Sequence, residues 1–417
     1  MQELKREEYL KKHHIKDISL VVASYIDSES VGISYMCTGS GSYILLSKDK
    51  SFRNFKKIPV QEEFFLLSDY ENILFDKIKK EDNIFYECGL YSCQAIIKKE
   101  DSFKYYYKII YNGYEDILRS FDFPNGNKSY SFYSFVDFQH GFNDVTHPLI
   151  EKIKDIKACP LLLNSGDLSA VSADYKEWYW LLDKTDLFKD VLFNSAIGDH
   201  EYWADYNIHA SLLKEPICYM KVFNNPKNGP KSEINKSYYF LYNNSLFVFI
   251  NTQDSDTVEN ENLNEIYVWF KDAINKNKGH FDYLFVYMHK AIYGSFENDT
   301  RVRRIMKNNF YKLFDDAKVD IVFSGHDHRY SRSLPLTDEK VCENGTIYLD
   351  LGSSGNKRRA YEEEVDKDGL HAKVLKIKED ELALGAICDV ENDHVNVKIY
   401  DQYGHLQDSL SLNKKER

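Results

Sequence analysis

The sequence predicts an α/β protein preceded by a β-sandwich, and three features support this fold class. From about residue 126 onward, short apolar runs bounded by Gly alternate with amphipathic patterns, which is typical of strands and helices in an α/β layer. The first 125 residues carry short strand-like runs separated by turn residues, and no long helical period follows the opening stretch. The turn-forming residues Pro124-Asn125-Gly126-Asn127 lie between the two regions.

We therefore expect two domains, a β-sandwich over residues 1–125 and an α/β domain over residues 126–417. The charged opening stretch, up to about Lys16, is expected to form a short helix or an arm. Strands are expected in the sandwich at 18–25, 31–36, 43–46 and 103–111. In the α/β domain, helices are expected near 146–158, 173–188, 261–277 and 299–318, and hairpins at 238–250 and 394–404.

The apolar runs of the second region end on residues that can bind a metal. The runs 161–165, 191–197, 284–288 and 319–324 lead into Gly166-Asp167, Gly198-Asp199-His200-Glu201, His289 and Gly325-His326-Asp327-His328, and the run 132–136 leads into Asp137-Phe138-Gln139. Residues at the carboxyl ends of such buried strands converge on one crevice at the edge of the sheet. Because carboxylate and imidazole are ligands that suit Zn, Fe and Mn, we expect a metal centre at this edge.

Composition limits the class of partner. Hydrophobic residues make up 43% and aromatic residues 15% of the chain, which excludes a disordered protein. The net charge is −12 and there is no long basic run, so binding of nucleic acid through a broad basic surface is not expected. An anionic substrate would therefore need a local cationic centre, which bound metal supplies. The seven cysteines are scattered and are expected to be buried or free thiols.

No membrane span is expected, because no stretch reaches the roughly 18 apolar residues of a membrane helix. The amino terminus lacks the apolar core of a signal peptide, so the sequence as it stands predicts a cytoplasmic protein. If a leader peptide preceded Met1 and had been removed, an exported protein would be expected instead.

Taken in order, the motifs resemble those of the calcineurin-like metallophosphoesterases, and most closely those of the purple acid phosphatase branch. They are Asp137-x-Gln139, Gly166-Asp167, Gly198-Asp199-His200-Glu201, Val286-x-x-His289 and Gly325-His326-x-His328. Any one of these motifs is common, whereas five in order, each at a strand end, are specific. The resemblance covers nearly the whole chain. It implies a βαβ metallophosphoesterase sandwich with mixed sheets, preceded by a fibronectin type III-like β-sandwich that ends near Phe121-Asp122-Phe123-Pro124.

The resemblance also implies two metal ions, divalent or trivalent, with Fe, Zn and Mn as the candidates. The residues implied for the first ion are Asp137, Asp167 and His328, and those for the second are Asp199, His289 and His326, with Asp167 bridging the two. A hydroxide bridging the metals would attack phosphorus in line. His200 would lie beside the site and orient the phosphate or protonate the leaving oxygen.

Three residues depart from the pattern of the family. Ala170 stands where purple acid phosphatases carry a tyrosine ligand, and Tyr175 lies five residues further on. Gln139 stands where relatives outside that branch often have His, and Asp199 where the family has Asn. An ionised carboxylate at 199 can bind metal, yet it cannot donate a hydrogen bond to phosphate and repels it.

The resemblance thus implies a phosphoric ester hydrolase that acts on a phosphorylated small-molecule substrate, either as a phosphomonoesterase or as a nucleotide phosphatase. The departures at Gln139, Ala170 and Asp199 leave open a weakened or inactive relative that acts as a binding or scaffold protein. A third alternative is a phosphodiesterase that uses the same metal centre. The metal content of the purified protein distinguishes the phosphomonoesterase from the inactive relative. A panel of monoesters and diesters distinguishes the phosphomonoesterase from the phosphodiesterase.

Overall fold

A computed structural model of the chain describes residues 2–70, 83–206, 213–252, 261–294, 310–359, 370–374 and 382–417. The chain forms two compact units that are not continuous in sequence. The first unit comprises Met1–Phe123, Ser169–Phe193 and His200–Asn225, and the second comprises Pro124–Leu168, Asn194–Asp199 and Pro226–Arg417. The predicted division into domains at residue 125 stays a prediction.

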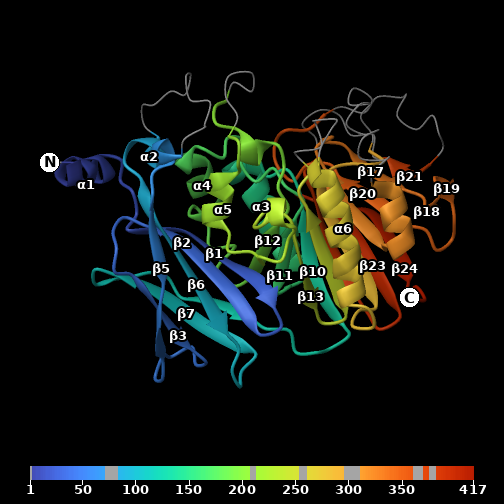
Figure 1. The fold of residues 1–417 in the computed structure, drawn as a ribbon, viewed down its shortest axis with the longest axis horizontal. Coiled ribbons are helices and arrows are strands. Elements are labelled where there is room, and N and C mark those ends of the chain that lie inside the picture. The colour runs from blue at the N-terminus through green and yellow to red at the C-terminus, as the bar shows by residue number, and fades with distance from the viewer. Residues whose placement is uncertain are drawn as a thin grey trace. The chain divides into compact units, whose positions relative to one another are not determined.

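Two antiparallel sheets form the β-rich part of the first unit (Figure 1). The four-stranded sheet has the order β1 (Ile18–Asp27), β2 (Ser30–Cys37), β6 (Leu90–Lys98) and β5 (Gln61–Phe65). The other sheet has the order β4 (Lys56–Pro59), β3 (Tyr43–Ser47), β7 (Lys104–Tyr111) and β8 (Tyr114–Glu115), with β9 (Arg119–Asp122) also paired to β7. These strands confirm the four that the sequence predicted in this region. The fibronectin type III-like assignment stays a prediction.

Short helices complete the first unit. They are α1 (Gln2–Lys12), η1 (Leu67–Asp69), α2 (Ile84–Glu87), α4 (Tyr175–Leu182), η3 (His200–Tyr202) and α5 (Ile217–Val222). Helix α1 confirms the predicted opening helix. Helix α4 begins after Asp174, whose carboxylate accepts a hydrogen bond from the Lys176 amide, and it ends at Asp183, whose Oδ2 accepts from the Leu20 amide of β1 at 2.9 Å. This contact ties the segment 169–193 to the N-terminal sheet.

The second unit contains two mixed sheets, as the sequence predicted. The six-stranded sheet has the order β12 (Leu192–Ser195), β11 (Leu161–Asn164), β10 (Tyr130–Phe135), β22 (Leu384–Val390), β23 (His394–Asp401) and β24 (Leu406–Asn413), and only the last two residues of β12 belong to this unit. The seven-stranded sheet has the order β13 (Tyr238–Tyr242), β14 (Ser245–Ile250), β15 (Tyr283–Lys290), β16 (Ile321–Gly325), β20 (Ile347–Leu351), β17 (Tyr330–Ser333) and β21 (His371–Val374). A small hairpin is formed by β18 (Leu336–Thr337) and β19 (Lys340–Val341).

Parallel pairing in the seven-stranded sheet is confined to its centre. Strands β14, β15, β16 and β20 run parallel, so their carboxyl ends lie at one edge. In the six-stranded sheet β10 and β11 are parallel, whereas β22, β23 and β24 are antiparallel. The hairpins β13–β14 and β23–β24 confirm the two that the sequence predicted.

The two sheets of the second unit pack face to face through aromatic rings. The ring of Phe132 on β10 lies 5.2 Å from that of Phe247 on β14 and 5.6 Å from that of Phe285 on β15. The Tyr287 hydroxyl on β15 donates to Ser134 Oγ on β10 at 3.1 Å. Because side chains alternate along a strand, the neighbouring residues of β14 and β15 point to the opposite face of the seven-stranded sheet.

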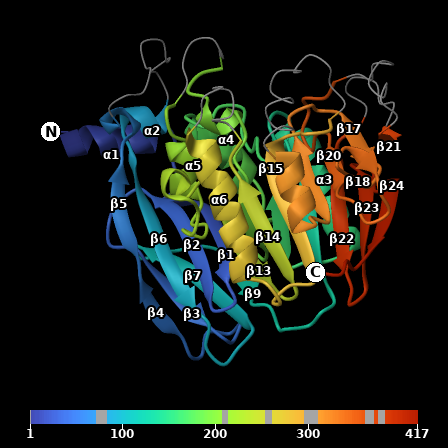
Figure 2. The same cartoon turned by 45° about the vertical axis from the view of Figure 1, so that its right-hand side comes forward.

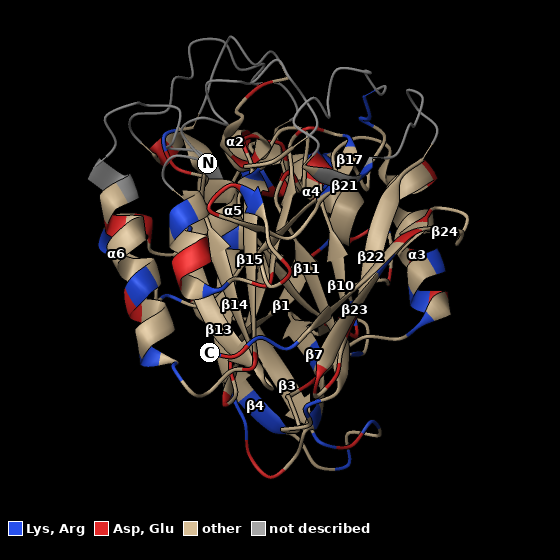
Figure 3. Cartoon of the chain, turned by 90° about the vertical axis from the view of Figure 1, so that its right-hand side faces the viewer, with Lys and Arg blue, Asp and Glu red and all other residues tan. Residues whose placement is uncertain are grey.

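That opposite face is covered by α6 (Glu261–Lys276), which runs along the sheet in Figure 2. Ile266, Trp269 and Phe270 of α6 share one buried core with Leu246 of β14 and Leu284 of β15. Charged residues of both signs lie along α6 (Figure 3), as expected for an amphipathic helix on a sheet.

Helix α3 (His147–Ile156) packs on the six-stranded sheet, so the second unit is a layered αββα sandwich. It follows a π-helical turn, η2 (Phe142–Thr146), and a short turn η4 (Lys231–Glu233) lies before β13. Of the predicted helix at 299–318, residues 310–317 are helical, and those before 310 lie outside the described residues. The seven cysteines are free, and all but Cys342 are buried. Among the described residues, no helix is long and apolar enough to cross a membrane.

Candidate metal centre

The candidate ligands of the second unit lie where its strands end. His289 is the last residue but one of β15, His326 follows β16 directly, and Asp137 and Asp167 follow β10 and β11. Left-handed backbone turns the chain at four of the ligands, with φ of 48° at Asp137, 57° at Asp167, 71° at His326 and 54° at His328. Non-glycine residues rarely adopt this conformation, and where they do it is concentrated at functional sites.

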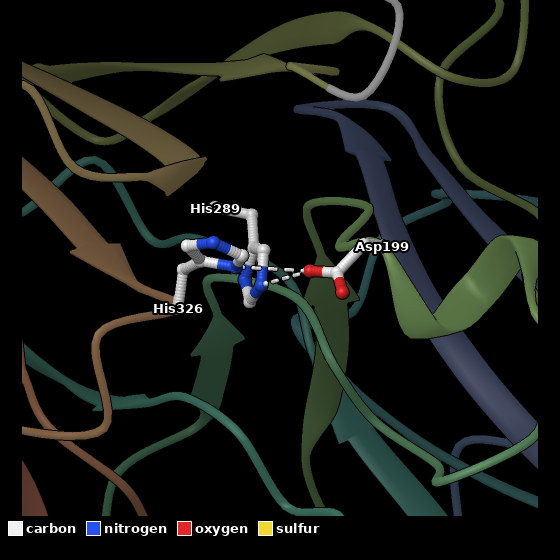
Figure 4. Close-up of side chains that lie close together, drawn as sticks. All are labelled: Asp199, His289 and His326. Atoms are coloured by element: carbon white, nitrogen blue, oxygen red, sulfur yellow. Dashed lines mark hydrogen bonds and ion pairs between the residues drawn. The ribbon is translucent and has the colours of Figure 1, made fainter. Parts of the chain in front are cut away.

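Asp199, His289 and His326 form one group that could hold a metal ion. Their side chains converge in Figure 4, where one carboxylate oxygen of Asp199 faces both imidazole rings. Asp199 Oδ1 lies 3.1 Å from His289 Nε2 and 3.0 Å from His326 Nδ1. His289 is fully buried, whereas His326 and Asp199 are partly exposed. The group therefore has a solvent-facing side, which a substrate needs.

Asp137, Asp167 and His328 form a second group, and each offers one ligand atom within 4.8 Å of the others. All three side chains are buried. His328 Nε2 lies 3.8 Å from Asp137 Oδ1, and the His326 amide donates to Asp137 Oδ2 at 3.2 Å. Both groups thus consist of carboxylates and imidazoles, and their role as metal ligands stays a prediction.

Asp167 connects the two groups. Its Oδ2 lies 3.2 Å from His289 Nε2, a member of the other group, and it accepts a hydrogen bond from Gln139 Nε2 at 2.8 Å. Gln139 Nε2 also lies 3.5 Å from Asp137 Oδ1, and its own Oε1 is buried without a hydrogen-bond partner. The Gln139 side chain is therefore held between the two buried carboxylates, at the position where some relatives carry His.

The protonation of His289 is defined by its backbone partner. Its Nδ1 lies 3.0 Å from the Ser165 carbonyl, which can only accept, so Nδ1 carries the proton. Nε2 then faces Asp167 and Asp199. Histidine ligands of metals are oriented in this way by a hydrogen bond from the other ring nitrogen.

Buried charge dominates the electrostatics of the site. Burial raises the pKa of Asp137 well above its usual value, and the charge of Asp167 adds to this. Burial alone would lower the pKa of His289, but Asp167 and Asp199 outweigh it and raise the pKa well above its usual value. Burial holds the pKa of His328 well below its usual value, and the charges of Lys357 and Arg359 lower it further.

These features fit a pair of metal ions. Three carboxylates meet in a largely buried space with imidazole as their main partner, and buried carboxylates are costly unless a cation neutralises them. His328 Nδ1 and Gln139 Oε1 are buried without a hydrogen-bond partner. Each is a further atom with a lone pair that could bind a metal ion beside these carboxylates. Oxygen and imidazole nitrogen donors suit Zn, Fe or Mn.

Ala170 and His200 belong to the first unit, so the position of His200 relative to the ligands stays a prediction. Within that unit, His200 Nδ1 lies 2.7 Å from the Ala170 carbonyl, and its ring stacks on Trp203 with centroids 3.5 Å apart. The Ala170 amide donates to Glu177 at 3.0 Å. Tyr175 is buried on α4, with its ring 5.5 Å from that of Phe85.

Sequence reasoning missed one segment at this edge, residues 352–359, which follow β20. Ser354 N donates to the Val136 carbonyl at 2.9 Å, Asn356 N to the His140 carbonyl at 3.1 Å, and Arg359 N to the His328 carbonyl at 3.1 Å. A signal for it was present, because the apolar run 347–351 ends on a glycine, as the runs before Asp167 and Asp199 do.

Comparison with known proteins supports one family. Residues 137–330 match the model of the calcineurin-like phosphoesterase family. The chain is 32% identical over 106 residues to purple acid phosphatase 1 of Ipomoea batatas, a match that covers 22% of each protein. It is 27% identical over 139 residues to purple acid phosphatase 23 of Arabidopsis thaliana, covering 33% of this chain and 30% of that protein. The aligned parts thus span less than a third of either relative.

A longer match, to phosphoenolpyruvate phosphatase of Allium cepa, is 23% identical over 288 residues and covers 62% of this chain and 56% of that protein. The fold is similar to that of purple acid phosphatase PPD1 from yellow lupin seeds, with a TM-score of 0.75 at 14% identity over 96% of this chain and 75% of that one. PhoD has a TM-score of 0.62 at 12% identity, over 94% of this chain and 92% of that one. Residues 137–330 therefore match a calcineurin-like phosphoesterase domain, and the chain is similar to purple acid phosphatases in parts of its sequence and in its fold.

Proposed function

We propose that this protein hydrolyses phosphate esters with the help of two metal ions. The observation that carries the proposal is that two groups of carboxylates and imidazoles meet at one edge of the second unit, with Asp167 in contact with both. Two ions a few ångströms apart are a common arrangement in phosphoester hydrolases.

The first ion would be held by Asp137, Asp167 and His328, and the second by Asp199, His289 and His326. Fe, Zn and Mn are the candidates, given the oxygen and nitrogen donors. When bound, such ions supply positive charge to the phosphate ester and lower the pKa of water at the site.

The protein's own residues hold this site in place. The Ser165 carbonyl orients His289 through Nδ1, and Gln139 holds one oxygen of Asp167 through its amide. His200 is our candidate for orienting the phosphate or protonating the leaving oxygen. Its Nδ1 faces the Ala170 carbonyl, which can only accept a hydrogen bond, so Nδ1 carries a proton and the orientation of the ring is held.

The substrate class we propose is a phosphomonoester or a nucleotide. The net charge of −12 makes the metal pair the main source of attraction for such an anion. An inactive relative with a binding role is the second candidate, and one observation favours it. Asp199 places a carboxylate between His289 and His326, where it adds negative charge beside an incoming phosphate.

The test is metal analysis of the purified protein combined with turnover of aryl phosphates. Two equivalents of metal per chain and hydrolysis of an aryl monophosphate are expected. Faster hydrolysis of an aryl diester than of the monoester would indicate a phosphodiesterase. Metal binding without turnover of either ester would favour the binding role, and the lack of both would contradict the proposal.

A further inference from the structure

The segment after β20, residues 352–359, contains the only run of three consecutive basic residues in the chain, Lys357-Arg358-Arg359. We name it the basic segment. Strand β20 is parallel to β16 and next to it, so both end at the same edge of the seven-stranded sheet. His326 directly follows β16, and the basic segment directly follows β20. The topology therefore brings three cations to the edge that carries the candidate ligands.

Backbone contacts fix the basic segment against two loops that carry ligands. Asn356 N donates to the His140 carbonyl, just beyond the loop of Asp137, and Arg359 N donates to the carbonyl of His328. A Cβ at Gly355 would lie 2.4 Å from the Gln139 carbonyl oxygen and 2.8 Å from that of Asp137. Only glycine permits this approach, so the position of the segment is set by the same loops that position the first group of ligands.

The three basic side chains differ in their surroundings. Arg358 is buried, and its Nη2 donates to Asn356 Oδ1 at 2.7 Å, which gives it a structural role within the segment. Lys357 and Arg359 are only partly buried. The Arg359 amide donates to the His328 carbonyl at 3.1 Å, and Lys357 lies two residues before Arg359. Lys357 and Arg359 are therefore cations on a segment that contacts the loop of His328.

We propose that Lys357 and Arg359 bind a second anionic group of the substrate, so that the site prefers nucleoside diphosphates or similar diphosphate compounds over monophosphates. This inference rests on the proposed function and specifies its substrate class. The metal pair meets the charge of one phosphate, whereas the three carboxylates of the site oppose any further negative charge. Cations close to the ligands offset that repulsion, and an arginine can bind a phosphate with two parallel hydrogen bonds.

The experiment compares ADP with AMP, which differ only by the second phosphate. The double variant Lys357→Gln/Arg359→Gln is compared with the wild type and with Lys340→Gln, which removes an exposed lysine on β19 of the same unit. We expect the double variant to lose about tenfold or more in kcat/KM for ADP and less than about threefold for AMP, since a charge-assisted contact to the second phosphate is lost. Lys340→Gln should leave both values unchanged.

Equal losses on both nucleotides, or no loss on ADP, would overturn the inference. Calorimetric binding of ADP and AMP provides a readout that does not need turnover. If the protein hydrolyses no ester, the proposed function fails, yet tighter binding of ADP than of AMP that disappears in the double variant would still support the inference. Equal binding of the two nucleotides by the wild type would contradict it. Thermal unfolding checks that the double variant is folded.

Discussion

Gly198 lies so close to Asp167 that a Cβ at Gly198 would be 2.1 Å from Asp167 Oδ1 and 2.6 Å from the Asp167 amide nitrogen. The loops after β11 and β12 therefore touch through a glycine and a candidate ligand. This contact explains why a glycine precedes Asp199 in the motif: any side chain there would displace the carboxylate that connects the two metal groups.

Gly198→Ala should accordingly weaken metal binding about tenfold or more and cost about 1–3 kcal/mol of stability, because overpacking forces the backbone or Asp167 to move. Metal titration and thermal unfolding measure the two effects. Gly279→Ala is the control for metal binding: a Cβ there meets nothing within 4 Å, but φ is 81°, so alanine should lower stability through backbone strain and leave metal affinity unchanged. Unchanged metal affinity in Gly198→Ala would show that Asp167 is not a ligand at this position.

Asp167→Asn and His326→Ala should each abolish hydrolysis and lower the metal content of the purified protein. Asp167 contacts both groups of ligands, and His326 is one of the two imidazoles of the second group. Folding should survive, because the apolar runs of the sheets are unchanged. His394→Ala, on β23 of the same unit, is a control that should keep activity and metal. Turnover at the wild-type rate in either ligand variant would refute the two-metal assignment.

Asp199→Asn should lower metal affinity but raise kcat/KM when metal is saturating. The carboxylate places one negative charge beside an incoming phosphate, a repulsion of about 1–4 kcal/mol at effective dielectric constants between those of water and 20. An amide keeps an oxygen for the metal and adds an N–H for the phosphate. The assay is a metal titration of both forms with an aryl phosphate. A slower Asn form at every metal concentration would mean that the carboxylate is an adapted catalytic feature.

Protein loaded with iron should show no strong visible absorption band from tyrosinate-to-iron charge transfer, because Ala170 stands at the position of the tyrosine ligand. An absorption spectrum after iron loading, with bound iron quantified in the same sample, checks this. A purple sample would require another tyrosine as ligand. Tyr175→Phe would then test the nearest candidate in sequence, although its ring packs against Phe85.

Stability should rise between about pH 8 and pH 10.5 through Lys415, which donates to the carbonyls of Val319 and Gly345. Burial lowers the pKa of Lys415 from its ordinary 10.5 to about 8. Below pH 8 Lys415 is charged in both the folded and the unfolded chain, and burial of the charge lowers stability. Between pH 8 and pH 10.5 the unfolded chain still binds the proton that the folded chain has released. The free energy of unfolding therefore increases with pH, by about 3 kcal/mol in total.

Lys415→Met removes the pH-dependent contribution of Lys415 to stability. The difference in unfolding free energy between wild type and variant should therefore change by about 3 kcal/mol between pH 8 and pH 10.5. Denaturant unfolding at several pH values measures it. Lys398→Met, on an exposed position of β23, is the control and should follow the wild type. A difference that does not vary with pH would contradict the assigned pKa.

The strand ends could be predicted from the sequence because each apolar run stops at a glycine or a polar residue, and parallel strands bring such ends together. The contacts between the side chains at these strand ends could not be predicted from the sequence. Gln139 reads in sequence as a departure from a ligand pattern, and only its distance of 2.8 Å from Asp167 shows that its amide supports a carboxylate. The segments 169–193 and 200–225 also join the N-terminal sheets through contacts such as that of Asp183 with Leu20, which no periodicity indicates.

The interleaving of the two units has a consequence for gene design. The chain passes from one unit to the other after residues 123, 168, 193, 199 and 225. A gene truncated at residue 125 would encode the two N-terminal sheets without α4 and α5, and its complement would carry those helices without the strands they cover. Neither fragment corresponds to a whole unit, so we expect a truncation or an exchange at residue 125 to disrupt the packing of the first unit.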